Sequence, residues 1–234
     1  MVVGGSGAIG MAVIEKLISE GHDCIGTYFK SRPKKLISVK IVWRELNLRN
    51  YKDTEEFIEN LEDIDSVIFC AGVSIPQKVG SIGKNEMLEM FEVNIISVIQ
   101  ITNALIAQIQ RKQFFRVVFL SSIVGSSGGI GLGVYASTKI AIEGFALSLN
   151  REFLKLKRIN PKFNLACTVI RLGYTDTPMT SGLNPKIRAA IEERTTLTRF
   201  LTPNEVSYLI SYLLRPESEG FTGSIIDLNG GVNL

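Results

Sequence analysis

Tyr135 and Lys139 stand four residues apart, and Ser122 lies thirteen positions before the tyrosine. On a helix this spacing places the phenol and the ammonium on one face, one turn from each other. A phenol with a pKa of about 10 is a poor acid at neutral pH, and a neighbouring ammonium favours the phenolate. We therefore expect Lys139 to lower the pKa of Tyr135, so that the phenol can transfer a proton. Taken alone, the pair is more typical of an ordinary helix with a half-buried tyrosine and a solvated lysine.

Ser122 closes an apolar segment. Residues 117–120 read Val-Val-Phe-Leu and predict a buried strand. In open α/β sheets, ligands bind at the carboxyl ends of the strands. We expect the hydroxyl of Ser122 to emerge at that edge of a sheet.

A glycine-rich turn follows the first two valines, with glycines at positions 4, 5, 7 and 10 and a helical apolar pattern after them. Glycines allow a tight turn close to a pyrophosphate, and a helix N-terminus offers free N–H groups and a positive dipole. We expect a dinucleotide to contact these residues of the turn: Gly4, Ser6, Gly7, Ala8, Ile9 and Gly10. The Gly-x-x-Gly-x-x-Gly spacing differs from the common Gly-x-Gly-x-x-Gly fingerprint. A plain glycine-rich turn is the alternative.

Short apolar runs alternate with helical patterns along the rest of the chain. Strands are predicted at residues 25–28, 39–43, 66–70, 115–120, 163–170 and 224–228. Helices are predicted at about 8–21, 52–61, 85–111, 134–157 and 203–214. This alternation indicates an α/β Rossmann fold, a doubly wound and mostly parallel sheet of about seven strands with helices on both faces. We expect residues 1–234 to form one such domain.

Taken together, these segments resemble the classical branch of the short-chain dehydrogenase/reductase family from one end of the chain to the other. The resemblance implies a catalytic tetrad of Asn94, Ser122, Tyr135 and Lys139. In that scheme Tyr135 gives a proton to the forming alkoxide, and Ser122 hydrogen-bonds the same oxygen. Lys139 also holds the nicotinamide ribose, and Asn94 supports a water that relays protons from Lys139.

The same resemblance implies cofactor contacts after several strands. Besides the glycine turn, Tyr135 and Lys139, the implied contacts are Tyr28, Lys30, Arg32, Asn47, Leu48, Cys70, Ala71, Gly72, Leu172, Gly173 and Thr175. Three positions depart from the family pattern. Ala8 replaces a glycine, Cys70 replaces an asparagine that supports the central strand, and Leu172 replaces a proline. We expect binding to survive the first change and the turn beside the nicotinamide to be looser after the last.

The end of the second predicted strand indicates which cofactor binds. NAD-specific folds carry a carboxylate there that holds the ribose hydroxyls. Here residues 26–29 read Gly-Thr-Tyr-Phe, and Lys30, Arg32, Lys34 and Lys35 follow them. Without a carboxylate nothing repels a 2′-phosphate, and the cations attract one. We expect NADP(H), with Lys30 and Arg32 as phosphate contacts; a solvated basic loop is the alternative.

Composition argues against several other classes of protein. A formal net charge of +3 over 234 residues is too small for a nucleic-acid-binding surface. We expect no apolar run of 18 residues that would span a membrane, and no signal peptide. Cys24, Cys70 and Cys167 predict reduced thiols and a cytoplasmic protein. With His22 as the single histidine, we expect no metal site.

The expected activity is the interconversion of a carbonyl and a secondary alcohol by hydride transfer to or from NADP(H), on a small-molecule substrate. The nearest likeness is to the 3-oxoacyl-[acyl-carrier-protein] reductases, which implies a ketone of that type. The family also implies homodimers or homotetramers formed through the long helices. Residues 174–200 are expected to form a lid over the substrate, with apolar and basic side chains mixed.

Two alternative functions stay open. The glycine spacing is also typical of the extended, sugar-nucleotide-modifying branch of the family, so one alternative is an epimerase, dehydratase or reductase of that type. The short chain and the tail 221–231 count against it. The other is a non-catalytic dinucleotide-binding sensor. It stays open because only three residues precede the glycines, so that either the first strand is clipped or the given start is late.

Overall fold

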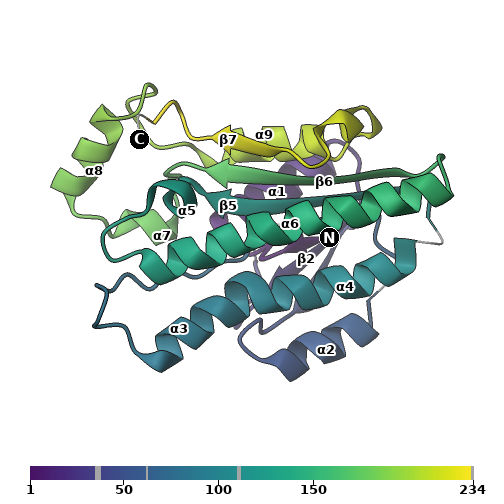
Figure 1. The fold of residues 1–234 in the computed structure, drawn as a ribbon, viewed down its shortest axis with the longest axis horizontal. Coiled ribbons are helices and arrows are strands. Elements are labelled where there is room, and N and C mark those ends of the chain that lie inside the picture. The colour runs from purple at the N-terminus through teal and green to yellow at the C-terminus, as the bar shows by residue number, and fades with distance from the viewer. Residues whose placement is uncertain (35–37, 62, 110–111, 233–234) are drawn as a thin grey trace.

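Seven parallel strands form one sheet through the centre of the molecule (Figure 1). The computed structural model describes residues 1–234 apart from 35–37, 62, 110–111 and 233–234. The strands are β1 (Val2–Val3), β2 (Cys24–Tyr28), β3 (Ile41–Glu45), β4 (Ser66–Phe69), β5 (Phe114–Ser122), β6 (Asn164–Leu172) and β7 (Ile225–Leu228). Their order is β3-β2-β1-β4-β5-β6-β7, so the chain changes direction across the sheet between β1 and β4. Ligands of doubly wound sheets bind at that switch point, and the predicted fold class is confirmed.

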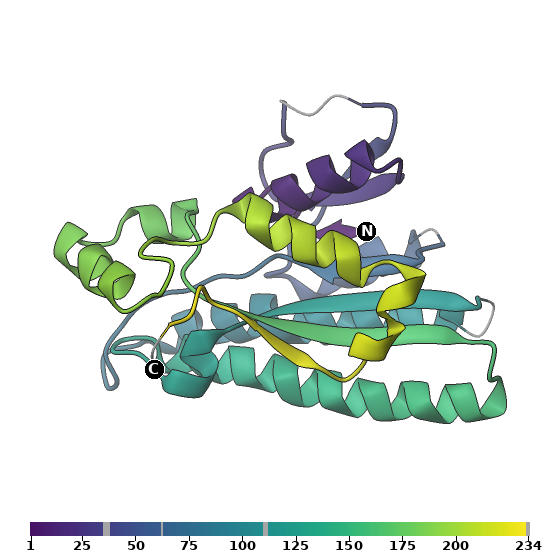
Figure 2. The same ribbon diagram turned by 90° about the horizontal axis from the view of Figure 1, so that it is seen from above.

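Helices cover both faces of the sheet. The helical segments are α1 (Ala8–Ser19), α2 (Tyr51–Glu59), α3 (Lys84–Phe91), the π-helical turn η1 (Glu92–Ile96), α4 (Ser97–Ile109), α5 (Ile123–Ser127), α6 (Gly133–Ile159), α7 (Pro178–Ser181), α8 (Pro185–Glu193), α9 (Pro203–Leu213) and the 3₁₀ turn η2 (Pro216–Phe221). Figure 2 shows α1 and α9 on one face and α4 and α6 on the other. Each face has its own buried apolar cluster. The strands are therefore buried on both sides, which is why they read as continuous apolar runs.

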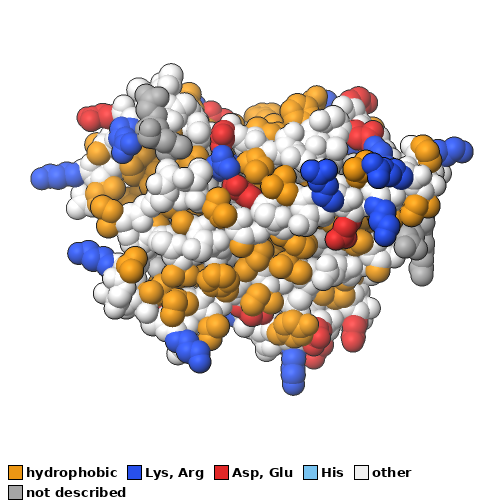
Figure 3. Space-filling model, viewed as in Figure 1, with side chains coloured by type: hydrophobic (Ala, Val, Ile, Leu, Met, Phe, Trp, Pro, Cys, Tyr) orange, Lys and Arg blue, Asp and Glu red, His pale blue; other side chains and the backbone are white. Residues whose placement is uncertain are grey.

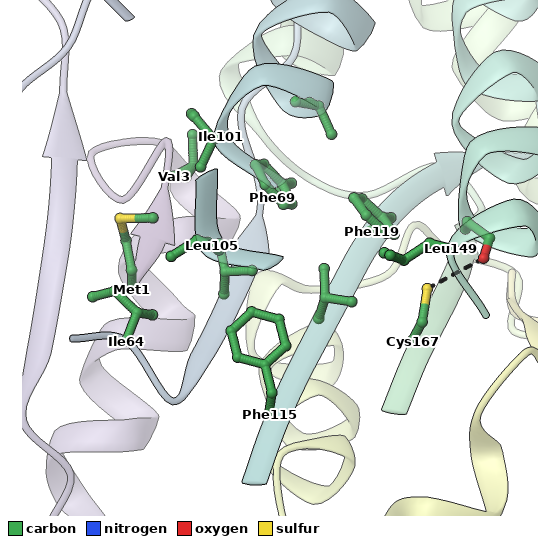
Figure 4. Packing of buried hydrophobic residues seen from close by; sticks show 14 of the residues in the cluster. Met1, Val3, Ile64, Phe69, Ile101, Leu105, Phe115, Phe119, Leu149 and Cys167 are labelled. Atoms are coloured by element: carbon green, nitrogen blue, oxygen red, sulfur yellow. Dashed lines mark hydrogen bonds between the residues drawn. The ribbon is translucent and has the colours of Figure 1, made fainter. Parts of the chain in front are cut away.

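Aromatic rings fix the two central strands against the helices of one face. Phe69 of β4 and Phe119 of β5 are in register and stack with ring centroids 5.2 Å apart (Figure 4). Phe115 meets Phe153 of α6 edge to face at 6.5 Å. Such pairs contribute about 0.5–1.5 kcal/mol beyond their burial. They anchor the strands whose carboxyl ends carry the candidate site.

Most predicted elements lie within a few residues of the observed ones, and three predictions need correction. The third strand begins at Ile41 rather than at Val39, which is fully exposed. The helix predicted at 85–111 is interrupted by the π-helical turn η1, and its last two positions, 110–111, lie outside the described residues, as does Lys35. The short helices α7 and α8 lie in the segment expected to be a lid, where we predicted none.

The run Lys84–Ile109 is long and apolar enough to cross a membrane, contrary to our expectation that no such run exists. Half of its most apolar window is buried inside the protein. Ile101 and Leu105 of this run pack into the same cluster as Phe115 (Figure 4). The core helix of a globular protein has these properties.

Candidate active site

A cavity of about 550 Å³ opens at the carboxyl ends of the strands. Helices α5, α7 and α8 lie at the same end of the sheet (Figure 1). These predicted residues line the cavity: Gly4, Ser6, Gly7, Ala8, Ile9, Gly10, Tyr28, Leu48, Cys70, Ala71, Gly72, Ser122, Tyr135, Lys139, Leu172, Gly173 and Thr175. Among the described residues, four predicted ones are missing from this lining: Lys30, Arg32, Asn47 and Asn94.

The glycine turn brings the backbone of β1 close to its neighbours. Gly4 has a φ of +80°, and a Cβ there would lie 2.5 Å from the backbone nitrogen of Ala71. A Cβ on Gly10 would lie 2.3 Å from the carbonyl oxygen of Gly4. Helix α1 begins after Gly7, and no side chain caps it. Its first N–H groups are therefore available to an anion such as a pyrophosphate, and Ala8, the departure from the family pattern, lines the same cradle.

One cation lies at the end of the cavity formed by β2 and β3. Arg49 and Lys139 are the only charged residues among the described lining residues, and no Asp or Glu is among them. The guanidinium of Arg49 lies 5.1 Å from the ring centroid of Phe29, and its Nε donates to Glu89 at 2.6 Å. The sequence reasoning missed Arg49. The signal was its place two residues after Asn47, which the family resemblance implied as a cofactor contact.

Ser122, Tyr135 and Lys139 converge on the same cavity from β5 and α6. Ser122 ends β5 and is also the N-cap of α5, where its Oγ accepts a bond from the amide of Val124 at 3.3 Å. The Nζ of Lys139 donates to the carbonyl of Leu120 at 3.0 Å and lies 5.6 Å from the ring centroid of Tyr135. The helical spacing of Tyr135 and Lys139 therefore does bring the two side chains together at the strand that ends in Ser122.

Burial dominates the acid–base properties of this pair. It raises the pKa of Tyr135 to about 12, against a smaller lowering by the hydrogen bond with Ser122. Burial also lowers the pKa of Lys139 to about 8. The prediction that Lys139 lowers the pKa of Tyr135 is therefore wrong for this structure. At neutral pH the phenol of Tyr135 therefore holds its proton, which is the form that a proton donor needs.

Asn94 is fully buried and reaches the site through other residues. Its Oδ1 accepts from the amide of Val73 at 2.8 Å. Its Nδ2 donates to the carbonyl of Val73 at 2.9 Å and to Oγ1 of Thr138 at 3.0 Å. Asn94 lies within η1, where the helical bonding is widened. These contacts fix the loop after β4 to helix α6. The expected role of Asn94 in supporting a water stays a prediction.

The turn after β6, where Leu172 replaces a proline, is bonded to the end of β7. The amide of Gly173 donates to the carbonyl of Leu228 at 2.9 Å. A Cβ on Gly173 would lie 2.7 Å from Cα of Asn229. The residues after β7 thus pack closely against this turn, and its expected loosening by Leu172 stays a prediction. Cys70, another of the three departures from the family pattern, also lines the cavity. Burial raises the pKa of its thiol to about 12, so the thiol is unreactive at neutral pH.

The segment expected as a lid contributes mostly apolar and hydroxyl side chains to the cavity. From this segment the cavity is lined by Tyr174, Thr177, Pro178, Met179, Thr180 and Leu183, besides Thr175. The lining residues that sequence reasoning missed, apart from Phe29 and Arg49, are Thr27, Leu46, Val73, Ser74, Pro76, Val93, Leu120, Ser121, Ile123, Val124 and Leu132. Most of them follow a strand end, which was the available signal. Arg188 of this segment pairs with Asp176 at 3.3 Å and with Glu192 at 2.9 Å. Its charge is thus matched within the segment itself.

In sequence, the chain is similar to enzymes from several bacteria. A family model described as enoyl-(acyl carrier protein) reductase matches residues 4–233. The 3-oxoacyl-[acyl-carrier-protein] reductase FabG of Aquifex aeolicus is 27% identical over 244 residues, which cover 99% of this chain and 96% of that protein. The 3-oxoacyl-[acyl-carrier-protein] reductase MabA of Mycobacterium tuberculosis is 25% identical over 239 residues, which cover 100% and 92%.

In fold, the chain is similar to a short-chain dehydrogenase from Burkholderia cenocepacia whose structure was solved in complex with NADP. The two structures superpose with a TM-score of 0.82 over 100% of this chain and 97% of the other, at 19% sequence identity. This likeness extends over the whole sheet and both helical layers.

Proposed function

The chain belongs to the short-chain dehydrogenase/reductase family, and on that premise we propose that it is an NADP(H)-dependent reductase of a 3-oxoacyl-type ketone. It is an oxidoreductase that interconverts a carbonyl and a secondary alcohol. One observation carries the proposal. Ser122, Tyr135 and Lys139 line the same cavity as the glycine turn that is shaped to hold a dinucleotide.

Each of these side chains has a separate role in the proposed reduction. The glycine turn would hold the dinucleotide, whose nicotinamide would supply a hydride for the substrate carbonyl carbon. Tyr135, which holds its proton at neutral pH, gives that proton to the carbonyl oxygen. Ser122 donates a hydrogen bond to the same oxygen as negative charge develops on it. Lys139, whose Nζ is held by the carbonyl of Leu120, lies beside the Tyr135 ring, and Asn94 holds α6 and the loop after β4 together.

Three features support NADP(H) over NAD(H). No carboxylate is among the described lining residues, so nothing in the described lining repels a 2′-phosphate. Arg49 supplies the cation at the adenosine end, and its Nη1 and Nη2 have no partner among the described residues. A guanidinium whose two terminal NH₂ groups are free suits bidentate binding of a phosphate. Lys30 and Arg32, our first candidates, lie outside the lining, so we assign the contact to Arg49.

The substrate half of the cavity favours an apolar ketone. Its walls include Pro76, Ile123, Leu132 and Met179, and Lys139 is the only described charged residue there. An acyl chain with a ketone near its polar end fits this lining, and the named relatives reduce 3-oxoacyl groups on acyl carrier protein. We propose that residues 174–200 close over this half as a lid.

A titration with NADPH and NADH, followed by nicotinamide fluorescence, tests the cofactor. A panel of 3-oxoacyl thioesters and cyclic ketones, followed by NADPH absorbance, then tests the reaction. We expect tight NADPH binding, weaker NADH binding and turnover of the 3-oxoacyl compounds. Binding of neither nucleotide would refute the proposed function.

We also propose that the protein assembles as a homodimer or homotetramer. Apolar side chains gather over the face covered by α4 and α6 (Figure 3). On α6, the exposed residues Ile140, Leu147 and Leu154 recur every seven positions and form one line. On α4, both side-chain polar atoms of Gln100 are buried without a partner among the described residues. Light scattering on the purified protein should give at least twice the monomer mass.

We propose a cytoplasmic location, and the cysteines support it. Cys24, Cys70 and Cys167 are all free thiols, and two of them are buried. Reduced thiols support a cytoplasmic location.

A further inference from the structure

A buried carboxylate lies one helical turn beyond Lys139. Glu143 of α6 is 6% exposed, and Ser121, the residue before Ser122, is 3% exposed. Oγ of Ser121 donates to Oε1 of Glu143 at 2.6 Å, and it also lies 3.3 Å from the carbonyl of Lys139. A hydroxyl can donate only one strong hydrogen bond, and the shorter distance assigns that bond to the carboxylate of Glu143. Glu143 therefore holds the strand segment beside the reacting serine against the helix that carries the lysine.

Arg171 closes the network from the next strand. Its Nε donates to Oε1 of Glu143 at 3.1 Å and its Nη2 to Oε2 at 2.8 Å, a bidentate pair. Its Nη1 reaches Asp227 on β7 at 3.3 Å. Ser121, Arg171 and Asp227 are register partners across three parallel strands. One carboxylate on α6 is thereby bonded to the strands that end at Ser122 and Leu172.

A buried ion pair of this kind is not explained by stability. Replacing such a pair by apolar residues of similar volume often leaves the stability unchanged or raises it, because burying the charges requires removing them from water. Burial raises the pKa of Glu143, and the bonds from Arg171 and Ser121 more than offset it, so that the pKa lies below its ordinary value. The carboxylate thus stays charged at neutral pH. Unlike an apolar contact, the ion pair has hydrogen bonds of fixed geometry, so it defines the position of the helix relative to the strands.

We propose that Glu143 is a positioning residue that sets the register of α6 against β5 and β6, so that Tyr135 and Lys139 meet Ser122. The proposal rests on the proposed function in assigning the chemistry to those three residues. It needs no further ligand. A register error of about 1 Å in the helix costs on the order of a hundredfold in rate.

The central test replaces the network by apolar groups in the triple variant Ser121→Ala/Glu143→Leu/Arg171→Met. We expect the thermal midpoint to stay within about 5 °C of wild type, because no unpaired buried charge is left. We expect kcat to fall at least about tenfold, with KM for the ketone and Kd for NADPH within about threefold. A folded triple variant with kcat within about twofold of wild type would overturn the proposal.

The same helix provides a matched control. Lys157 and Glu219 form an ion pair at the far end of α6. The variant Lys157→Met/Glu219→Gln should leave kcat unchanged. An equal loss of kcat in this control would mean that any disturbed ion pair on α6 slows the reaction, which contradicts a specific role for Glu143.

Two further measurements keep the proposal testable. If the triple variant fails to fold, Ser121→Ala should lower kcat by about threefold and Ser121→Thr, which keeps the hydroxyl, should restore it. Amide hydrogen exchange should rise at residues 134–141 of the triple variant and stay unchanged at 148–158. That readout does not need turnover, so it decides the positioning role even if wild type reduces no ketone and the proposed function fails.

Discussion

Asn94 and Val73 exchange two hydrogen bonds, although 21 residues separate them in the chain. The side-chain amide of Asn94 takes the place of a backbone partner for Val73, accepting from its N–H at 2.8 Å and donating to its C=O at 2.9 Å. A third bond, to Thr138, reaches the turn of α6 between Tyr135 and Lys139. The π-helical turn places Asn94 where one amide joins the loop after β4 to the catalytic helix.

Removing this amide should cost both stability and rate. Asn94→Ala leaves the N–H and C=O of Val73 without partners, and we expect a loss of about 2 kcal/mol in the free energy of unfolding. Ser97→Ala is the matched control, since Ser97 is equally buried but bonds only within its own helix, to Val93. Urea denaturation measures both. A cost for Asn94→Ala no larger than that for Ser97→Ala would contradict the bridging role.

Tyr135→Phe should abolish reduction and leave the fold and the cofactor site intact. The change removes only the phenolic hydroxyl, which we assign as the proton donor, so kcat should fall by a factor of about 10² to 10⁴. The Kd for NADPH, measured by fluorescence, should stay within about twofold. Substantial residual activity would show that another group supplies the proton.

Arg49→Met should weaken NADPH about tenfold or more and leave NADH nearly unchanged, because a charged hydrogen bond to the 2′-phosphate is lost. Arg49→Lys should bind NADPH with an affinity between those of wild type and Arg49→Met, because lysine keeps the charge but not the paired N–H donors of the guanidinium. Glu89→Gln keeps an acceptor for Nε and removes the competing charge, so NADPH should bind more tightly. Fluorescence titrations measure all three variants.

Lys30→Met and Arg32→Met serve as controls for Arg49, since neither residue is among the described lining residues of the cavity. Each should change the Kd for NADPH by less than about threefold. A larger loss in either control than in Arg49→Met would return the phosphate contact to the loop after β2.

Buried Lys139 should make the stability of the protein rise with pH. Its pKa is lowered from 10.5 to about 8, so between those values the unfolded chain binds the additional proton. At pH 7 the penalty is about 3 kcal/mol, from about 1.4 kcal/mol per pH unit. Lys139→Met removes it. The variant should therefore gain stability over wild type at pH 7, and chemical denaturation should show this advantage shrinking as the pH rises from 8 towards 10.5. An advantage independent of pH would refute the lowered pKa.

The sequence by itself determined the parts of the site that depend on local periodicity. The helical period places Tyr135 and Lys139 on one face, and apolar runs end where Ser122 and Gly173 enter the cavity. The glycines at 4 and 10 are required by contacts of 2.5 Å and 2.3 Å that any Cβ would make. Spacing of this kind is readable because neighbours in the chain are also neighbours in space.

Only the tertiary structure decided the features that depend on distant segments. Burial by several elements raises the pKa of Tyr135, against the effect that Lys139 suggested. Arg49, and neither Lys30 nor Arg32, is among the residues that line the cavity, because β3 returns beside β2 and brings its own end to the pocket. Desolvation and strand order are properties of the packed chain. No local pattern encodes them, since they sum over residues that meet only after folding.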